Sequence, residues 1–259
     1  LTSGDGVKKV YLKCRNTLLI ESVIVNDTII LDTTKPITTS NIAGTVGENG
    51  WYVSGVTINL TANDQVIGSG VAGVWYRYNM DNGNYSNWTE YSEFILVSDG
   101  IYGVEYYAID KAGNIESIRN VTVKVDMTAP AGVAILINNG AQYTNSSSVM
   151  LTLNATDNSS GLWQMQFKNE VGDWSSWVSY SSTYPWALPI GDGTKSVQLK
   201  VRDRAGNENF ISGSIVLDRT KPFTYRHLAG TISENGWYKS DVLVTLTASD
   251  ETSGVLYTY

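Results

Sequence analysis

The chain has 259 residues, of which 42% are hydrophobic and 17% are charged, and its formal net charge is −7. This hydrophobic content is sufficient for buried cores, whereas the negative charge and the lack of a lysine- or arginine-rich cluster argue against a nucleic acid partner. No stretch approaches the roughly twenty apolar residues of a membrane-spanning helix. No signal-peptide pattern is visible either, although both could lie outside this sequence if it is part of a longer protein.

One set of motifs recurs along the chain at intervals of about 93 residues. The dipeptide "DG" occurs at Asp5, Asp99 and Asp192, and the runs "LDTTKP", "VDMTAP" and "LDRTKP" follow each of them. The runs "AIDKAGN" and "VRDRAGN" form another pair with the same spacing. Because an active site is normally built once in a chain, motifs that recur at a fixed interval predict a repeated structural unit.

The repeats are out of phase with the two ends of the sequence. Residues 1–33 match only the C-terminal half of a unit, and residues 220–259 match only the N-terminal half. Residues 34–127 and 128–219 each match a complete unit. The half units have two explanations, which are a window cut from a longer chain and a protomer whose halves are completed by neighbouring copies.

Within each unit, hydrophobic and polar residues alternate, as is typical of half-buried β-strands. In chain order, this alternation covers "VTINLTA" (56–62), "YGVEYYAI" (102–109), "NVTVKV" (120–125) and "VLVTLTA" (242–248). Turn-forming clusters of Gly, Asn and Asp interrupt the strands. About seven short strands in roughly ninety residues predict an antiparallel two-sheet sandwich. The expected fold class is therefore all-β, with tandem β-sandwich repeats arranged as a rod.

The order "NGWY", "VTINLTA", "DG", "YYAIDKAGN" and "VDMTAP" resembles the tandem immunoglobulin-like or fibronectin-III-like repeats of bacterial and archaeal cell-surface proteins. The resemblance covers essentially the whole chain and specifies a module rather than an activity. It implies an extracellular structural protein that forms a stalk, an envelope layer or a filament, with neighbouring copies or further repeats of the same chain as partners. The alternative is an adhesin or glycan-binding module of a larger surface protein or secreted enzyme, with cell-surface glycans as partners. The segment "CRNTLLIES" departs from the pattern because it lacks the "DxAGN" turn.

Recurring aspartates predict calcium sites at the domain junctions. In such a sandwich, the B–C and F–G loops lie at one pole, where the chain also enters the domain. We therefore expect one group from the leading linker and these loops at each junction: Asp32, Asp64 and Asp110; then Asp126, Asp157 and Asp203; then Asp218 and Asp250. Carboxylates gathered without basic partners repel one another, and calcium accepts oxygen ligands in flexible geometry. The open alternative is that each aspartate only bonds the N–H groups of its own turn.

Acceptor patterns for N-glycosylation, N-x-S/T, occur eight times. They begin at Asn26, Asn59, Asn84, Asn87, Asn120, Asn145, Asn154 and Asn158. Either the chain is a glycoprotein, or Asn, Ser and Thr are simply common in a β-rich surface protein. The patterns in "NYSNWT" and "NATDNSS" are the best candidates because they fall in expected loops, where an acceptor is reachable.

Enzymatic chemistry finds little support in the sequence. His227 is the only histidine, and no nucleophile motif lies near it, so we expect an ordinary surface residue. Asp64 and Asp110 could form a glycosidase carboxylate pair, but their recurrence in each complete unit argues against that role. Cys14 has no partner for a disulfide, and its place in a strand pattern predicts a small buried core residue. Apart from calcium, no cofactor is expected.

Aromatic residues are concentrated in the second complete unit. Trp174, Trp177 and Trp186 suggest a surface on which sugar rings could stack, as in carbohydrate-binding modules. The alternative is that these side chains pack in the core or at the edge of a sheet.

Overall fold

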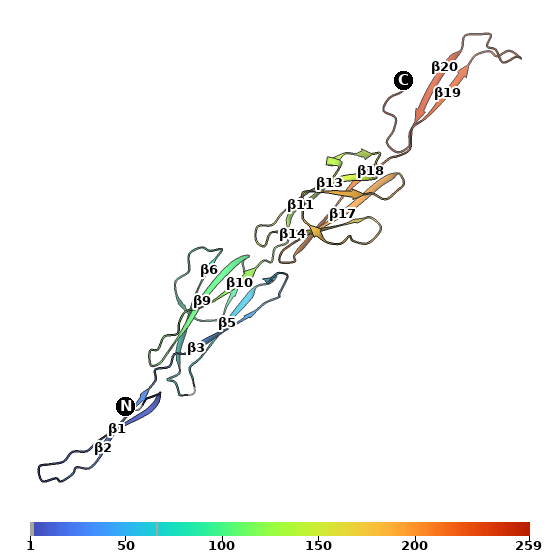
Figure 1. Cartoon of the computed structure of the whole chain (residues 1–259). Coiled ribbons are helices and arrows are strands. Elements are labelled where there is room, and N and C mark those ends of the chain that lie inside the picture. Colours follow the sequence, from blue (N-terminus) through green and yellow to red (C-terminus); the bar gives the residue numbers. More distant parts are fainter. Residues whose placement is uncertain (1–2, 66) are drawn as a thin grey trace. The chain divides into compact units, whose positions relative to one another are not determined.

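The computed structural model describes residues 3–65 and 67–259 (Figure 1). Over these residues the chain forms twenty β-strands and one short 3-10 turn, η1 (Asn138–Gly140). No helix in the described part of the chain has the length and apolar character needed to cross a membrane. The contacts divide the chain into two compact units, Leu1–Thr128 with Arg204–Asn207 and Ala129–Asp203 with Glu208–Tyr259.

The first unit contains a complete two-sheet sandwich. Its strands are β3 (Ile37–Ala43), β4 (Trp51–Tyr52), β5 (Val56–Asn63), β6 (Val71–Met80), β7 (Thr89–Glu90), β8 (Phe94–Leu96), β9 (Gly100–Asp110) and β10 (Arg119–Val125). One sheet has the order β3-β5-β8 and the other has the order β4-β10-β9-β6-β7. All pairs are antiparallel except β4 with β10. This is the A-B-E and A′-G-F-C-C′ arrangement of an immunoglobulin-like sandwich.

The second unit contains a sandwich with the same topology. Its strands are β11 (Ala131–Ile137), β12 (Tyr143–Thr144), β13 (Ser148–Thr156), β14 (Leu162–Asn169), β15 (Val178–Ser179), β16 (Thr183–Ala187), β17 (Gly193–Asp203) and β18 (Glu208–Leu217). The sheets have the orders β11-β13-β16 and β12-β18-β17-β14-β15. The all-β, tandem-sandwich prediction is therefore confirmed. Each sandwich has eight strands instead of about seven, because two-residue strands form at both edges of the larger sheet.

Each core follows from strand alternation. On β17, the inward side chains Val197, Leu199 and Val201 are fully buried, while the residues between them are half-buried on the other face. They pack with Leu151 of the opposite sheet and with Phe167 in one apolar cluster. Burying a side chain of this size is worth about 1.5–3 kcal/mol. The burial of the inward side chains, which the alternation in the sequence predicts, therefore contributes strongly to the stability of the sandwich.

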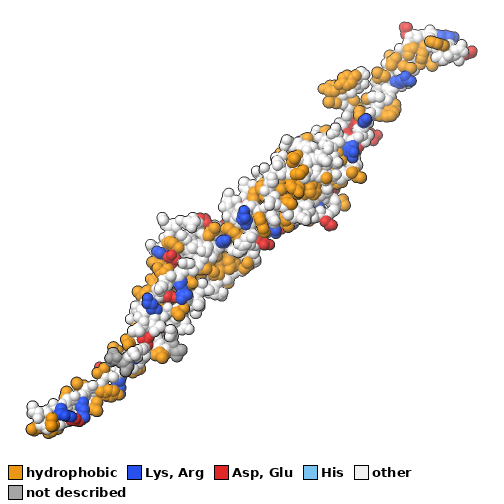
Figure 2. All heavy atoms as spheres, in the orientation of Figure 1, with side chains coloured by type: hydrophobic (Ala, Val, Ile, Leu, Met, Phe, Trp, Pro, Cys, Tyr) orange, Lys and Arg blue, Asp and Glu red, His pale blue; other side chains and the backbone are white. Residues whose placement is uncertain are grey.

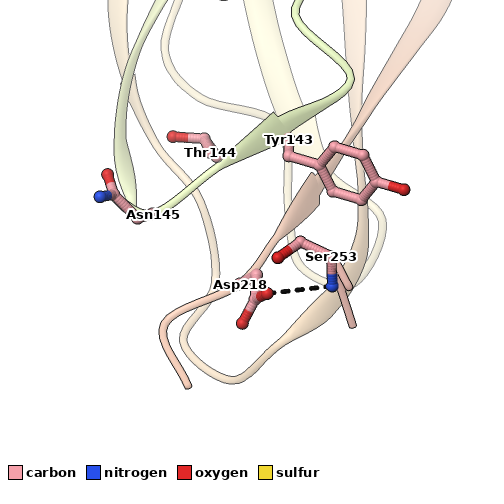
Figure 3. Close-up of a pocket in the computed structure, with 5 residues that line it drawn as sticks. All are labelled: Tyr143, Thr144, Asn145, Asp218 and Ser253. Atoms are coloured by element: carbon pink, nitrogen blue, oxygen red, sulfur yellow. Dashed lines mark hydrogen bonds between the residues drawn. The ribbon is translucent and has the colours of Figure 1, made fainter. Parts of the chain in front are cut away.

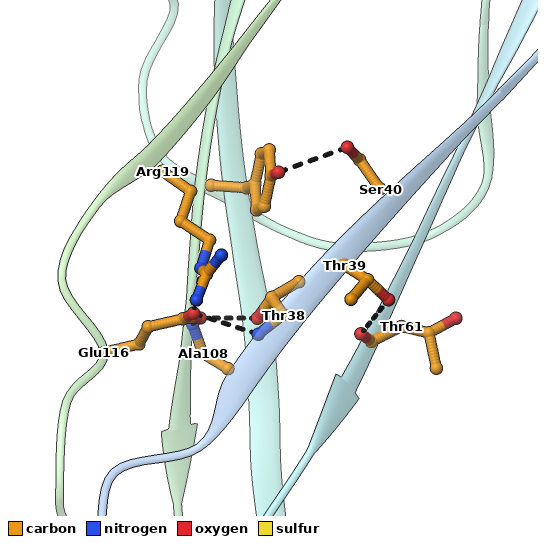
Figure 4. Close-up of polar contacts among 8 residues, drawn as sticks. Thr38, Thr39, Ser40, Thr61, Ala108, Glu116 and Arg119 are labelled. Carbon is orange, nitrogen blue, oxygen red and sulfur yellow. Dashed lines mark hydrogen bonds and ion pairs between the residues drawn. The ribbon is translucent and has the colours of Figure 1, made fainter.

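A buried carboxylate also joins the two sheets of the first sandwich. Glu116, which is only 7% exposed, follows β9 and accepts hydrogen bonds from the N–H and hydroxyl of Thr38 on β3, at 2.9 and 2.6 Å. It also accepts from the N–H of Ala108 on β9 and from Nε of Arg119 (Figure 4). Because β3 and β9 belong to different sheets, Glu116 fixes one sheet against the other. The sequence pattern alone did not single out this glutamate.

The half units form single hairpins. β1 (Gly6–Leu12) pairs with β2 (Val25–Leu31), and β19 (Phe223–Ala229) pairs with β20 (Leu243–Ser249). Figure 2 shows hydrophobic side chains on the surface of both hairpins. The hairpins thus have the apolar pattern of a sandwich strand pair without the second sheet that would cover it.

Equivalent positions in the complete sandwich show what the hairpins lack. Val10 is 54% exposed, whereas Val104, at the same place in the complete repeat, is fully buried. Leu246 is 57% exposed, whereas its counterpart Leu60 is 6% exposed.

The prediction that Cys14 is buried was wrong, and the hairpin explains why. Cys14 is exposed and lies just beyond the end of β1. The corresponding residue of the complete repeat, Ala108, is fully buried because the opposite sheet covers it. The sequence pattern identified the inward face correctly, but the described chain supplies nothing to cover that face.

We expect Leu151→Ala to destabilise the second sandwich by about 2–5 kcal/mol, since it would leave a cavity at a fully buried position. The neighbouring substitution Met150→Ala is a matched control, because Met150 is 47% exposed on the other face of the same strand. Urea unfolding followed by tryptophan fluorescence would measure both. Equal losses of stability would contradict the assigned direction of β13.

Candidate functional site

Three aspartates hold the linkers that follow the repeats. In each case the carboxylate of a "DG" dipeptide accepts a hydrogen bond from a main-chain N–H and another from a threonine hydroxyl in the next "DxT" linker. The pairs are Asp5 with Thr33 and Thr34, Asp99 with Met127 and Thr128, and Asp192 with Arg219 and Thr220. The sequence showed both motifs as repeats, but it did not show that they bond to each other.

These bonds keep two of the carboxylates ionised to lower pH. The hydroxyls of Thr34 and Thr33 lower the pKa of Asp5 below its ordinary value. In the same way, the Thr220 hydroxyl and the Arg219 N–H lower the pKa of Asp192. A carboxyl whose pKa is lower in the folded state stabilises the fold fully above its unfolded pKa. That contribution is lost as the pH falls through the folded pKa.

The structure brings together Asp32, Asp64 and Asp110, all in the first unit. Asp32 follows β2 in the linker, Asp64 follows β5, and Asp110 is the last residue of β9. One carboxylate oxygen from each residue lies within 4.8 Å of the corresponding oxygens of the other two. Three distant parts of the sequence therefore place negative groups at one end of the sandwich.

Two of these aspartates are well supplied with hydrogen-bond donors. Asp32 accepts from the N–H of Ser69 at 2.6 Å and from the N–H of Thr34 at 3.1 Å. The donors of Ser69 lower the pKa of Asp32 and outweigh the opposing effects of burial and of nearby Asp5. Asp110 accepts from the N–H and the side-chain amide of Asn114, at 2.8 and 2.7 Å.

Asp64 differs from its two neighbours. Its Oδ2 accepts a hydrogen bond from the N–H of Gly70 at 2.7 Å, but its Oδ1 is buried and has no hydrogen-bond partner. Gly68 lies directly against this carboxylate, because a Cβ atom there would come within 2.5–2.7 Å of its atoms. A buried carboxylate oxygen without a partner is costly, so this atom requires an explanation.

The described ion pairs leave this group of aspartates uncompensated. Among the ion pairs of the described residues, none includes Asp32, Asp64 or Asp110. The three carboxylates offer only oxygen atoms as possible metal ligands. Oxygen ligands suit a hard cation such as Ca²⁺ better than a transition metal.

The second predicted group is divided between the two units. Asp126 belongs to the first unit and is fully buried, whereas Asp157 and Asp203 belong to the second. Asp157 accepts hydrogen bonds within its own loop, from the N–H groups of Ser159 and Gly161. Asp203 is fully buried at the end of β17. Whether these three aspartates meet depends on how the two units are placed, so their convergence stays a prediction.

The last pair, Asp218 and Asp250, lies wholly in the second unit. Asp218 accepts a hydrogen bond from the N–H of Ser253 at 3.0 Å, beside a pocket of about 400 Å³ that Tyr143 and Thr144 also line (Figure 3). Burial pushes the pKa of Asp250 upward. The N–H donors of its own turn, led by Ser253, outweigh this effect and leave the pKa lowered.

The glycosylation patterns differ in their structural settings. Asn84, Asn87, Asn145 and Asn158 lie in exposed loops, whereas Asn26, Asn59, Asn120 and Asn154 lie in strands. The loop placement expected for Asn154 was wrong, because β13 extends through Thr156 and the side-chain amide of Asn154 donates to the carbonyl of Gly132. Glycosylation itself stays a prediction at all eight positions.

The three tryptophans do not share one surface. Trp186 packs on Phe167, with ring centroids 5.4 Å apart, and its Nε1 donates to Oδ1 of Asn169. Its ring therefore lies against the apolar core of the sandwich.

Trp174 and Trp177 lie instead with cationic side chains of β17. Lys200 Nζ is 5.1 Å from the ring centroid of Trp174, and the Arg202 guanidinium is 4.4 Å from that of Trp177. Lys200 and Arg202 alternate with buried residues, so this is the face away from the core. A sugar-binding role stays a prediction, and the face that could serve it contains only two of the three predicted rings.

His227 lies exposed on β19, as expected of a surface residue. Asp64 and Asp110, which were considered as a glycosidase carboxylate pair, lie together with Asp32. They form a group of three carboxylates and not an isolated pair. The absence of enzymatic activity stays a prediction.

Comparisons with known proteins give only distant structural matches. No protein-family model and no curated protein sequence matches the chain. Among solved structures, fibronectin-III-like modules of CbhA from Clostridium thermocellum are 12% identical, cover 70% of this chain and 94% of their own, and have a TM-score of 0.34. A two-domain fibronectin type III segment of chicken tenascin is 12% identical, covers 71% and 99%, and has a TM-score of 0.36.

A tetra-tandem repeat from the extending region of a large adhesion protein is 16% identical over 97% of this chain and 72% of its own length, with a TM-score of 0.34. TM-scores at this level carry no argument about function. The identification of immunoglobulin-like, fibronectin-III-like sandwich repeats therefore rests on the strand orders of the chain itself.

We expect the Asp192 carboxyl to titrate below its ordinary pKa of 3.8. Thr220→Val removes the hydroxyl donor and should move this pKa upward, so the linker contact would be lost at a higher pH. Carbon NMR titration of the aspartate carboxyl signals would measure the shift. Thr245→Val, at an exposed position on β20, is the control and should leave the value unchanged. An identical pKa in parent and Thr220→Val would rule out the hydrogen bond from the Thr220 hydroxyl to Asp192.

Proposed function

We propose that this chain is a structural segment of an extracellular surface protein, in which sandwich repeats space or support other parts of a stalk, an envelope layer or a filament. One observation carries the proposal: the same aspartate-to-threonine contact holds the linker after each of three successive units. Asp99 and Thr128 form it after the first complete sandwich, and Asp192 and Thr220 form it after the second. A contact repeated at each linker restricts the conformations of the linker relative to the repeat before it. A spacer requires such a restriction.

The chemistry of the remaining surface is compatible with this role. Four glycosylation patterns lie in exposed loops, where an extracellular modifying enzyme could reach them. The side chains that repeat between units serve packing, turns and linkers, so they give no unit a chemistry that its neighbour lacks. A spacer needs this uniformity, whereas an enzyme does not.

Labelling intact cells of the source organism with an antibody raised against the chain tests the location. We expect surface labelling that disappears after brief protease treatment of unbroken cells. A cytoplasmic protein serves as the control and should resist the same treatment. Labelling that appears only after the cells are broken would contradict the proposal.

A second candidate function is filament assembly, and the open hairpins favour it. Val10 and Leu246 are more than half exposed although their counterparts are buried in the complete sandwich. An uncovered apolar sheet face is a liability that proteins normally cover. The hairpin β1–β2 of one copy, which corresponds to part of the larger sheet, would lie against β19–β20 of the next, which corresponds to part of the smaller sheet. Such head-to-tail contacts do not close on themselves and therefore produce fibres.

Sedimentation of the chain at increasing concentration would test assembly. We expect oligomers that Leu246→Asp disrupts, because a charge would enter the shared core. Thr247→Asp is the matched control, since the next residue along β20 faces the other side of the hairpin. A chain that stays monomeric at high concentration, with both sandwiches folded, would refute assembly. It would leave the spacer function intact.

A further inference from the structure

We propose that the first sandwich carries an N-linked glycan on Asn87 and that this glycan packs on an aromatic surface beside it. Asn87 begins the acceptor pattern "NWT" in the exposed loop between β6 and β7. The surface, called the aromatic face below, is formed by five side chains in mutual contact: Trp75, Arg77, Tyr85, Trp88 and Tyr107. The inference rests on the extracellular location in the proposed function, because the enzymes that transfer such glycans act outside the cytoplasm.

The aromatic face lies on the solvent side of the larger sheet. On β6, Val74 and Tyr76 pack against the core, so Trp75 between them points the other way. Tyr107 of β9 is directly opposite Trp75 and stacks on it, with ring centroids 5.7 Å apart. The two neighbours of Tyr107 along β9 are buried. The alternation that builds the core therefore also places these two rings outside it.

The loop that carries Asn87 adds two more rings to the aromatic face. The Arg77 guanidinium lies 4.6 Å from the ring centroid of Tyr85 and 4.6 Å from that of Trp88. An ion pair with Glu105, at 2.7 Å, holds this guanidinium in place. Tyr85 is 38% exposed and Trp88 is half-buried, so both rings keep surface that another group can contact.

A sugar ring suits this surface chemically. A pyranose ring has C–H groups on its faces, which pack on aromatic rings, and hydroxyl groups at its rim, which bond to charged side chains. Consecutive Cα atoms lie about 3.8 Å apart, so the Cα atom of Asn87 is within roughly 8 Å of that of Tyr85. The first sugars of a glycan on Asn87 therefore reach the aromatic face. Arg77 and Glu105 provide partners there for the hydroxyl groups.

The attachment requires a transferase and a glycan donor from outside the chain. Nδ2 of Asn87 attacks C1 of an oligosaccharide that is linked to a lipid phosphate. A C1–N bond forms as the C1–O bond breaks, the lipid phosphate leaves with the bonding electrons, and the amide gives up one proton. Among the hydrogen bonds of the described residues, none uses this amide, since Thr89 donates to the main-chain carbonyl of Asn87. The amide is therefore available for the reaction.

Two other acceptor patterns in exposed loops are less suitable. A transferase recognises the hydroxyl group two positions after the asparagine. For Asn84, the hydroxyl of Ser86 already accepts a hydrogen bond from the N–H of Tyr78 and is part of the hairpin. For Asn158, the corresponding Ser160 is only 7% exposed. In both cases the hydroxyl is less accessible than that of the exposed threonine in "NWT".

The fourth loop pattern, at Asn145, also follows an aromatic residue. The ring of Tyr143, two positions earlier, points away from the Asn145 amide (Figure 3). Among the aromatic and cation–π contacts of residues 3–65 and 67–259, none includes Tyr143. A glycan on Asn145 would therefore have no aromatic face to pack on.

The second sandwich shows that an asparagine is not needed to form this hairpin. Ser86 and Ser175 make the same two hydrogen bonds, one through the N–H and one through the hydroxyl, with the main chain of the preceding strand. This equivalence aligns Ser176 with Asn87. Because Val178 follows two positions later, the second hairpin has no acceptor pattern. The requirements of the turn therefore do not explain Asn87.

Mass spectrometry of peptides from the whole chain, expressed in the source organism, tests the attachment. We expect an oligosaccharide on the peptide that contains Asn87, and its loss in Asn87→Gln. The peptide that contains Ser176, from the equivalent hairpin, is the internal control and should have no N-linked glycan. An unmodified Asn87 in chains at the cell surface would overturn this inference and leave the proposed function intact. Chains found only inside the cell would overturn both.

Thermal unfolding tests whether the glycan packs on the aromatic face. We expect the glycosylated parent to melt at a higher temperature than Asn87→Gln, and both to melt alike when produced in a host without N-glycosylation. Tyr85→Ala should reduce the stabilisation by the glycan, whereas Tyr143→Ala, at another exposed tyrosine, should leave it unchanged. A purely structural loss in Tyr85→Ala would lower the melting temperature equally with and without the glycan. That result would overturn packing on Tyr85.

Discussion

The structure depends on covering the inner face of one sheet with that of another. In the second sandwich, buried residues alternate along β17 and meet Leu151 and Phe167 in one cluster. The terminal hairpins have the same alternation, but within residues 3–65 and 67–259 no opposite sheet covers them, and their apolar side chains are exposed. Each sheet of this chain is therefore stabilised by packing against a complementary sheet. A single hairpin is held only by its backbone hydrogen bonds.

Once the sheets are packed, the ends of the sandwich determine where polar groups meet. Strands β5 and β9 lie in different sheets, yet both end at the same pole, so Asp64 and Asp110 become neighbours. Linker residues join them because the chain enters at that pole. At the other end of each repeat, the "DG" aspartates meet the departing linker. The carboxylates thus gather at linkers because the topology places the strand ends there.

The sequence predicted the repeat, the all-β sandwich and the inward face of the strands, because these follow from spacing and alternation. It also suggested which aspartates would meet, since strand order determines which loops share a pole. It could not predict the exposure of Cys14, which depends on a sheet that the described chain does not supply. The linker contacts of Asp99 and Asp192, and the bonds from Thr38 to Glu116, were missed because each joins residues far apart in sequence. Only three-dimensional pairing reveals such contacts.

The departure at Asn16 helps to separate the two roles of the aspartates. Asn16 stands where the complete repeat has Asp110, and its side-chain oxygen accepts hydrogen bonds from the N–H groups of Leu18 and Ile20. A neutral amide oxygen therefore suffices to order a turn at this position. The negative charge of Asp110 is not required for that purpose. What distinguishes Asp110 is its position, where its carboxylate adjoins those of Asp32 and Asp64.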